Sequence, residues 1–417
     1  MSSAPAASPV SIAPVQDGAA HAAHAAAAIV VATVEPVRGE TGVQTHSRAL
    51  QAGLASIGQP CVLQTPLAHS RMWMPVFALR PLLLHRLNKT WSTWWLRHWH
   101  EAALRAGLIR AIRNRDVSAV VAQCPVSARA ALDARRRLGR DFPVAMVCHF
   151  NFSEATEYRD KGELDSQPYF DSMQAMEKRV LESVDRVIYV SNWARQVVEQ
   201  ERGIHPRASS VIWNGVARQP APSGITRADI GLQADDLVLV SVGTLEPRKN
   251  QLSLVKLFAK VAAEHPSARL ILVGDGPSRA QIESSIAELG IGSKVRLLGF
   301  RRDVAHLLPL ADLYVHASLL ENCPIVLLEA ARAGLPVAAV PAGGVPELLD
   351  ALGGAALNLD DPASLRSLLA DPAARAQAGR AARDAFERHF TCEAMVAEYV
   401  RTLRPAPAGA AGGDARP

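Results

Sequence analysis

The stretch SLLENCPIVLLEAARAGLPVAAVPAGGVPE, residues 318–347, decides the fold of the second half of the chain. LYVHAS (313–318) leads into it and is an apolar run typical of a buried strand, and PVAAV (336–340) is a second such run. Pro324 suits the first position of a helix, where its missing N–H costs nothing. Gly334 and the proline two residues later end that helix. The pattern therefore predicts a strand, an acidic loop, a helix and a second strand.

Two glutamates flank the start of this predicted helix. Glu321 lies in the loop, and Glu329 follows eight positions later in the helix. The N–H groups that begin such a helix point out of the carboxyl edge of the sheet and attract phosphate. Two carboxylates beside a phosphate site can accept hydrogen bonds from sugar hydroxyls, which suits a nucleotide-linked sugar. The alternative is a buried helix that carries two glutamates and binds nothing.

Strands and helices alternate along the rest of the chain. Near-continuous apolar strands separated by helices, such as the helix expected at 42–58, are typical of parallel sheets covered on both faces. The first series of strands is expected at 29–36, 61–66, 118–123, 144–149, 186–191 and 210–215. The second series is expected at 237–243, 269–274, 295–299, 313–318 and 336–340. The predicted fold class is therefore α/β, with two doubly wound domains whose strand ends face a shared cleft.

Shifts in composition predict the limits of these domains. Ala/Ser/Pro-rich tails are expected to be disordered, and a stretch rich in Pro, Gly and polar residues is expected to be a linker. The expected order is a tail at 1–27, a first domain at 28–216, a linker at 217–236, a second domain at 237–390, a last helix at 391–404 and a tail at 405–417.

The paired-glutamate stretch resembles the motif of the family 4 retaining glycosyltransferases, which have the GT-B fold. The resemblance extends from about residue 28 to residue 403. It implies that the first domain binds the acceptor, that the second binds a nucleotide-sugar donor, and that 390–404 ends in a helix that crosses back onto the first domain. The donor-binding residues expected in the stretch itself are Asn322, Cys323, Ile325 and Glu329.

Two cations follow the first strand of the second domain, in GTLEPRKN (243–250). Arg248 can bind phosphate oxygens with two parallel hydrogen bonds, whereas Lys249 acts as a point charge. The resemblance implies that such cations neutralise the leaving nucleotide without a metal. The family often has an arginine directly after Gly243, and this chain has Thr244 there, so the role moves to Arg248. Adjacent basic residues at a helix start can also be solvated surface.

Glycines after two other strands predict close approach to a ligand. LVGDGP (272–277) places Gly274 at a strand end, but Arg279 occupies the place of a third glycine, so a nicotinamide cofactor is disfavoured. The resemblance implies that the nucleotide base lies near LGFRRD (298–303), against the backbone around Phe300 and Arg301. The alternative for Phe300 is a place in the core.

Two histidines of the first domain are candidates for the cleft. RGETGVQTHSRAL (38–50) resembles the family's glycine-rich loop, with Gly42 on the donor side and His46 towards the acceptor. The family's second adjacent glycine is replaced by Thr41. His149 ends the strand at 144–149, where it can stabilise developing charge. A lone histidine is otherwise more often structural.

The segment 80–105 contains basic residues together with four of the seven tryptophans of the chain. At about 100° per residue, the tryptophans fall on one broad face of a helix and the basic residues on the other. This arrangement suits the headgroup region of an anionic membrane. A core helix whose basic residues are solvated is the alternative. The tryptophans are Trp91, Trp94, Trp95 and Trp99, and the basic residues of the opposite face are Arg86, Lys89 and Arg97.

Composition limits the remaining possibilities. A chain of 417 residues with 49% hydrophobic and 20% charged residues is typical of a globular protein with two domains. The net charge of +5 is too small to indicate nucleic acid. No apolar run reaches the roughly 18 residues that span a bilayer, and no secretion signal is evident. Five scattered cysteines indicate reduced thiols in the cytoplasm. No Asp-x-Asp follows a strand, so we expect no metal and no other cofactor.

The working hypothesis is a retaining, metal-independent hexosyltransferase of surface polysaccharide biosynthesis. Arg248 and Lys249 would stabilise the leaving diphosphate, the glutamates would orient sugar and ribose hydroxyls, and His149 would support an oxocarbenium-like state. The acceptor would be a glycan, and the Trp/Arg segment favours a lipid-linked one at the inner face of the cytoplasmic membrane. A GT-B sugar-nucleotide epimerase and a non-catalytic sugar-nucleotide-binding protein are the alternatives.

Overall fold

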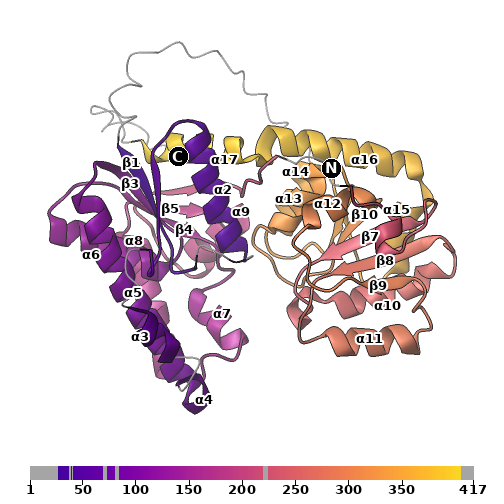
Figure 1. Cartoon of the computed structure of the whole chain (residues 1–417), viewed down its shortest axis with the longest axis horizontal. Helices are drawn as coiled ribbons and strands as arrows, with labels where there is room; N and C mark the ends of the chain where they lie inside the picture. The colour runs from indigo at the N-terminus through magenta and orange to yellow at the C-terminus, as the bar shows by residue number, and fades with distance from the viewer. Residues whose placement is uncertain are drawn as a thin grey trace, which may run out of the picture.

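Six parallel strands form the sheet of the first domain, in the order β2-β1-β3-β4-β5-β6 (Figure 1). The computed structural model describes residues 27–36, 39, 41–68, 73–79, 84–218 and 224–404. The strand order reverses at β1, so the crevice at the carboxyl edge of this sheet opens beside β1 and β3. The strands are β1 (Ala28–Ala32), β2 (Cys61–Gln64), β3 (Val117–Ala122), β4 (Val144–Cys148), β5 (Arg186–Tyr189) and β6 (Ser209–Val211).

A second sheet of six parallel strands has the order β12-β11-β10-β7-β8-β9. Here the order reverses at β7, which pairs with β8 on one side and β10 on the other. Ligands of doubly wound sheets bind at such a reversal, beyond the carboxyl ends of the strands. The strands are β7 (Leu237–Val242), β8 (Ala268–Val273), β9 (Val295–Leu297), β10 (Leu313–His316), β11 (Val337–Ala339) and β12 (Ala355–Ala356).

Helices cover both faces of each sheet, because the strands present apolar side chains to both sides. The first domain contains α2 (Gly42–Ser56), α3 (Met74–Leu79), α4 (His85–Leu87), α5 (Lys89–Arg113), α6 (Pro125–Leu138), α7 (Glu154–Asp160), α8 (Gln167–Ser183), α9 (Asn192–Gln196) and the π-helix η3 (Val197–Glu201). The second contains η4 (Ala228–Ile230), η5 (Pro247–Lys249), α10 (Gln251–Ala262), α11 (Arg279–Glu288), α12 (Val304–Leu307), η6 (Leu308–Leu310), α13 (Ile325–Arg332), α14 (Val345–Leu352), α15 (Pro362–Ala370), α16 (Pro372–Ala385) and the π-helix η7 (Phe386–Phe390).

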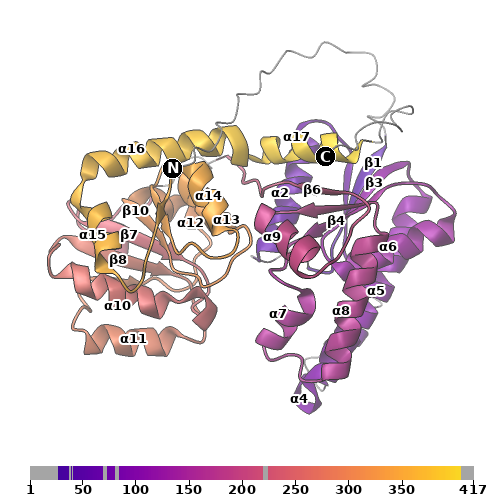
Figure 2. The same cartoon turned by 180° about the vertical axis from the view of Figure 1, so that it is seen from behind.

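The last helix, α17 (Cys392–Leu403), leaves the second domain and packs on α2 of the first, as both views of the ribbon show (Figures 1 and 2). The N–H of Val216 donates to the carbonyl of Phe390 over 2.8 Å, at the point where the chain passes between the domains. A side chain at Gly53 would lie 2.5 Å from Val396, so this glycine lets α17 lie directly on α2. The end of the chain therefore fastens the second domain to the first.

The observed elements differ from the expected ones mainly at their limits. Ile230 and Leu232 lie in the core with β7 and β8, so residues 224–236 fold with the second domain and do not form a linker. The two-residue strand β12 was not predicted, because two alanines carry no strand signal. The expected tails at 1–27 and 405–417 lie outside the described residues, apart from residue 27, as do residues 219–223 of the expected linker.

Candidate active site

Glu321 stands at the centre of a charged cluster beyond the ends of β7 and β10. Its carboxylate pairs with Lys249 and accepts a hydrogen bond from the hydroxyl of Ser318 over 2.8 Å. A nitrogen of Arg248 lies 3.5 Å away. The backbone joins the two loops as well, since the N–H of Leu319 donates to the carbonyl of Arg248 over 2.9 Å. The structure thus brings together three of the residues that the sequence assigned to the site.

The surroundings of Glu321 keep it ionised although its side chain is only 12% exposed. Burial alone would raise its pKa, but His316, Lys249 and Arg248 hold that pKa well below its usual range. His316 ends β10 and is buried, and burial lowers its pKa despite the adjacent carboxylate. Its Nε2 lies 3.7 Å from a carboxylate oxygen of Glu321.

The helix α13 begins beside this cluster, and no side chain of the described residues caps its N-terminus. Pro324 is the residue before the first helical turn, one position earlier than the sequence suggested. The half-buried Ile325 opens the helix, so its N–H group is one of those that an α-helix leaves without an internal partner. Glu329 lies one turn further along, close enough to Tyr314 that it and Glu321, after burial, help to raise the pKa of that phenol. An uncapped helix start beside two cations is suited to phosphate.

Two loops come into close contact beside the cluster because their residues are glycines. A side chain at Gly274 would lie 2.0 Å from the carbonyl oxygen of Gly243, so the ends of β8 and β7 could not otherwise meet. Further along the same edge, Phe300 is 58% exposed, with the guanidinium of Arg302 6.0 Å from the centre of its ring. The core alternative for Phe300 is therefore wrong. Its neighbour Arg301 pairs with Asp303 over 2.5 Å.

His149 follows β4 at the facing edge of the first domain. Its Nε2 lies 2.8 Å from the side-chain oxygen of Gln123, and its ring packs edge-on against His46 with 4.8 Å between centres. Burial and the neighbouring His46 lower the pKa of His149 well below 6.5. The side-chain amide of Asn322 donates to the carbonyl of Phe150 over 3.2 Å. Because Asn322 follows Glu321 and Phe150 follows His149, this bond joins the two segments that carry Glu321 and His149. The neutral His149 therefore lies in the part of the first domain that contacts Asn322, the residue after Glu321.

His46 is buried, and both of its ring nitrogens bond to other side chains. Nδ1 lies 2.9 Å from the side-chain oxygen of Asn214, and Nε2 lies 3.1 Å from the hydroxyl of Tyr399 on α17. Because the nitrogen of that amide donates to the carbonyl of Cys323, its oxygen must accept from Nδ1–H, and Nε2 must accept from the phenol. These contacts favour a role in positioning over direct contact with an acceptor. Gly42 begins α2 nearby, and Thr41 caps that helix.

Polar groups of Asn322 and Cys323 form hydrogen bonds with residues of the first domain. The side-chain oxygen of Asn322 bonds to the hydroxyl of Ser191, and the carbonyl of Cys323 accepts from Asn214 over 2.9 Å. The sequence assigned both residues to the donor, because they lie in the motif. Conversely, His316 and Ser318 were missed. The signal that could have found them was their position at the end of a buried strand, the same signal that singled out His149.

The Trp/Arg segment does not divide into one aromatic and one basic face. Arg97 is buried and lies 2.6 Å from Glu154, so the prediction that it meets membrane headgroups was wrong, as was the alternative that it is solvated. Trp95 donates to the carbonyl of Val76 over 2.9 Å, and Trp99 packs against Trp73 with 5.7 Å between ring centres, so these two face α3. Trp91 and Trp94 are 68% and 45% exposed. Arg80 and the side chain of Arg86 lie outside the described residues.

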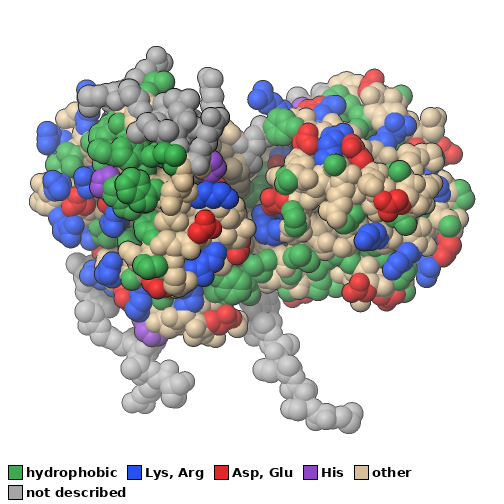
Figure 3. Space-filling model, turned by 90° about the horizontal axis from the view of Figure 1, so that it is seen from below, with side chains coloured by type: hydrophobic (Ala, Val, Ile, Leu, Met, Phe, Trp, Pro, Cys, Tyr) green, Lys and Arg blue, Asp and Glu red, His purple; other side chains and the backbone are tan. Residues whose placement is uncertain are grey.

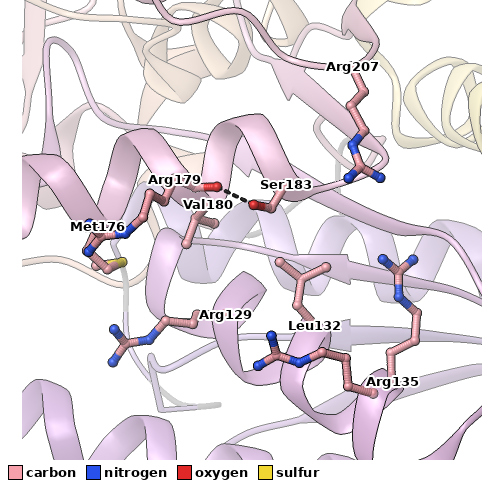
Figure 4. Close-up of a pocket in the computed structure, with 9 residues that line it drawn as sticks. Arg129, Leu132, Arg135, Met176, Arg179, Val180, Ser183 and Arg207 are labelled. Atoms are coloured by element: carbon pink, nitrogen blue, oxygen red, sulfur yellow. Dashed lines mark hydrogen bonds between the residues drawn. The ribbon is translucent and has the colours of Figure 1, made fainter.

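A hollow of about 350 Å³ lies on the other side of the first domain, between α6 and α8 (Figure 4). The hollow lies near the C-terminal ends of α6 and α8, which lead into β4 and β5. It is therefore at the amino edge of the sheet, away from the cluster. Four of its five arginines lie near acids, but these pairs involve only three acids because Asp185 serves two of the arginines, so the hollow is a basic surface with a net positive charge. The pairs are Arg129 with Glu101, Arg135 with Asp185 at 2.5 Å, Arg136 with Asp133 at 3.0 Å and Arg207 with Asp185 at 3.8 Å.

Solved structures of similar shape show the fold. The structure of Anabaena Alr3699/HepE in complex with UDP and glucose matches with a TM-score of 0.65 and 20% identity, covering 91% of this chain and 99% of that one. WaaG, a glycosyltransferase involved in lipopolysaccharide biosynthesis, matches with a TM-score of 0.62 and 16% identity, covering 91% and 100%. The chain therefore has the GT-B fold of glycosyltransferases.

Two family models name the family. The model described as Glycosyltransferase Family 4 matches residues 41–219, and the model described as Glycosyl transferases group 1 matches residues 224–385. The two matches lie in the first and the second domain respectively. The chain belongs to glycosyltransferase family 4.

Curated relatives match over shorter stretches. The GPI3 subunit of the phosphatidylinositol N-acetylglucosaminyltransferase of Saccharomyces cerevisiae is 33% identical over 175 residues, which are 40% of this chain and 38% of that one. The UDP-Gal:alpha-D-GlcNAc-diphosphoundecaprenol alpha-1,3-galactosyltransferase of Escherichia coli is 31% identical over 160 residues, 36% of this chain and 41% of that one. The chain thus matches less than half of the length of either relative.

The buried His46 predicts that acid destabilises the fold. Burial lowers its pKa from 6.5 to about 4, against the hydrogen bond with Asn214, which raises it. Between these two pH values the unfolded chain binds a proton that the folded chain does not, so stability falls as the pH decreases from about 6.5 to about 4. The loss due to this group is about 3 kcal/mol at about 1.4 kcal/mol per pH unit.

Urea unfolding at pH 7 and pH 5 measures this effect. His46→Gln should lose stability at pH 7, and its stability should fall less than that of the wild type on going to pH 5. The exposed His205 serves as the control, because His205→Gln should keep the wild-type dependence on pH. An equal fall in His46→Gln and the wild type would contradict the assignment of His46 as a neutral, buried group.

Proposed function

We propose that this protein transfers a hexose from a nucleoside-diphosphate sugar to a glycan acceptor, with retention of the anomeric configuration. The observation that carries the proposal is the cluster of Glu321, Lys249 and Arg248 beside the uncapped start of α13. It combines two cations and free helical N–H groups for a diphosphate with carboxylates for hydroxyl groups. It also lies where the strand order of the donor-side sheet reverses.

Each residue of the cluster has a role in this reaction. The diphosphate would bind at the N-terminus of α13, with Arg248 and Lys249 on its oxygens. Glu329 would accept hydrogen bonds from the ribose, and Glu321 from hydroxyls of the transferred sugar. Phe300 is exposed at the same edge and offers a ring face for the base.

Bond breaking and bond making would take place on one face of the sugar. The bond from the anomeric carbon to the diphosphate oxygen breaks as the acceptor oxygen bonds to that carbon. The acceptor proton passes to the departing phosphate oxygen, so no separate base is required. His149, neutral and across from the cluster, would lie against the oxocarbenium-like sugar, and the cations would stabilise the charge that grows on the diphosphate.

Two other functions share this donor site. A sugar-nucleotide epimerase would release a free sugar product without any acceptor, and a binding protein would show no turnover. The intact charge cluster argues against a protein that has lost its activity. Product analysis with a panel of nucleotide sugars, with and without membrane extract, distinguishes the three, because only a transferase requires the acceptor.

The lower end of the first domain supports a lipid-linked acceptor. Apolar side chains gather there beside basic ones on the surface seen from below (Figure 3). Leu87 and Trp91 are 71% and 68% exposed, and Met74 is 52% exposed, with the exposed Lys89 among them. Exposed aromatic and aliphatic groups mixed with cations suit the boundary of an anionic membrane. Along the described residues, no helix is long and apolar enough to cross a bilayer.

The names of two relatives point the same way. The E. coli relative is named for a diphosphoundecaprenol substrate. A Corynebacterium glutamicum relative, 28% identical over 250 residues that cover 55% of this chain and 65% of that one, is a GDP-mannose-dependent mannosyltransferase named for a phosphatidylinositol monomannoside. We therefore place the proposed reaction at the inner face of the cytoplasmic membrane, where the five free thiols of the chain would stay reduced.

Lys249→Ala should lower kcat by about 100-fold or more, because a preorganised charge that meets the leaving group typically contributes that much. The fold should survive, since the side chain is 18% exposed and Arg248 remains beside Glu321. The matched control is Lys256→Ala on α10, where the lysine is exposed to solvent. Near wild-type turnover in a folded Lys249→Ala protein would remove this residue from the mechanism.

Transfer should persist in excess EDTA, because the proposal gives the charge of the leaving diphosphate to Arg248 and Lys249. The assay compares initial rates with and without chelator, on protein freed of bound metal beforehand. Activity that disappears with EDTA and returns with Mg²⁺ or Mn²⁺ would overturn the metal-independent mechanism.

The protein should co-sediment with anionic vesicles at low salt, less so as salt rises, because basic residues near the surface contribute about 1 kcal/mol each. Replacing Leu87 and Trp91 by serine should weaken binding at least about tenfold, since burying one such side chain contributes about 1.5–3 kcal/mol. Leu289→Ser on the second domain, 43% exposed, is the control. Equal binding by all three proteins, or none by the wild type, would leave a soluble acceptor as the better proposal.

A further inference from the structure

Glu347, in the first turn of α14, forms hydrogen bonds with the first domain. Its carboxylate accepts hydrogen bonds from the N–H and the side-chain amide of Asn192, over 3.1 and 3.0 Å. It also accepts from the N–H of Trp193 over 3.3 Å and from the indole of Trp213 over 3.4 Å. One acidic side chain of the second domain therefore takes four donors from two separate segments of the first.

These bonds complete the N-terminus of α9. A helix begins with N–H groups that have no partner within it. Ser191 accepts from the N–H of Ala194 over 3.0 Å, which leaves the two N–H groups before it. Glu347 accepts from both, and it lies on the other domain. When the domains separate, α9 loses these acceptors.

The position of Glu347 in its own helix explains why it is available. A glutamate at the third position of a helix commonly accepts from the N–H of the residue that caps the helix. In α14 that residue is Gly344, whose N–H donates to the carbonyl of Glu321 over 2.8 Å. Its usual donor is occupied, and the side chain of Glu347 extends to the other domain. The start of α9 there favours a negative charge.

The segment that carries Glu347 is in register with the loop that carries Glu321. A side chain at Gly343 would lie 2.2 Å from the carbonyl oxygen of Glu321, and one at Gly344 would lie 1.9 Å from that of Asn322. Only glycines let these loops lie so close. Because Asn322 bonds to Ser191, directly before α9, both contacts meet the same short segment of the first domain.

We propose that Glu347 is a positioning residue that fixes the separation of the two domains, through the start of α9, at the value the transfer needs. The proposal rests on the proposed function for its kinetic consequence, but the domain separation itself is independent of it. With Glu347 bonded to α9, His149 stays opposite Glu321 and Lys249. Without it, the donor site stays intact within the second domain, and the acceptor side moves away.

Small-angle scattering of the full-length protein, with and without UDP, tests the separation directly. Glu347→Ala should increase the radius of gyration relative to the wild type, and Glu347→Gln, which keeps the shape and one acceptor oxygen, should give a smaller increase. Affinity for UDP, measured by calorimetry, should stay within about twofold of the wild type. Asp350→Asn is the matched control, an exposed acid one turn further along the same helix, and should scatter like the wild type.

A second variant tests the contact from the other domain. Asn192→Ala removes one donor at an exposed position, so the fold is retained. The increases in radius for Asn192→Ala and Glu347→Gln should not add in the double variant, because both remove parts of one contact. With a donor and acceptor in hand, kcat/KM for the acceptor should fall at least tenfold in Glu347→Ala, and Asp350→Asn should keep it.

The results of these experiments distinguish a failure of the positioning role of Glu347 from a failure of the proposed transferase function. Wild-type scattering by Glu347→Ala, or additive effects in the double variant, would overturn the positioning role. A loss of UDP affinity equal to the loss of kcat/KM would also overturn it, because Glu347 would then belong to the donor site. Absence of transfer by the wild type with every nucleotide sugar would refute the proposed function and leave the scattering result to decide the role of Glu347.

Discussion

The ionised carboxylate of Glu321 is the group around which the donor side of the structure is arranged. It stays ionised under burial only because Lys249, Arg248 and His316 surround it. Those neighbours lie at the end of β10 and just after β7, two adjacent strands at the reversal of the sheet order, so the fold itself supplies the charge balance. The backbone of Glu321 receives the loop before α14, and the next residue, Asn322, bonds to the first domain. The donor side and the domain contact are therefore built on one loop.

The sheets could be predicted from the sequence because each central strand is apolar on both faces. Runs such as LVLVSV at β7 have no other stable place than a covered parallel sheet, and the helix that follows each strand fixes the parallel direction. The limits of the second domain could not be predicted in the same way. Ile230 and Leu232 lie in a stretch rich in turn residues, and their burial depends on β7 and β8, which are distant in the sequence.

The contacts within the candidate site could be predicted where residues lie at strand ends. The prediction failed where loops turn towards another domain. Arg248, Lys249 and Glu321 meet because the carboxyl ends of β7 and β10 are neighbours. Asn322 lies one residue further on and faces Ser191, and nothing local distinguishes the two directions. Arg97 is a similar case, because the acid that holds it in the interior, Glu154, is far away in the sequence and invisible to helical periodicity. A single sequence does not show which polar or charged residues of distant segments will meet.

The charges of the cluster bear on how the proposed reaction ends. Two cations and one ionised carboxylate leave a net charge of about +1, and the start of α13 adds about half a positive charge. A sugar-linked diphosphate brings about two negative charges, and breaking its bond to the sugar adds a third, which the cluster cannot match. Transfer of the acceptor proton to the departing oxygen removes that third charge as it forms. A strongly acidic Glu321 helps here, since it does not take the proton itself. In the proposed reaction the departing phosphate would therefore receive the proton, and Glu321 would stay ionised.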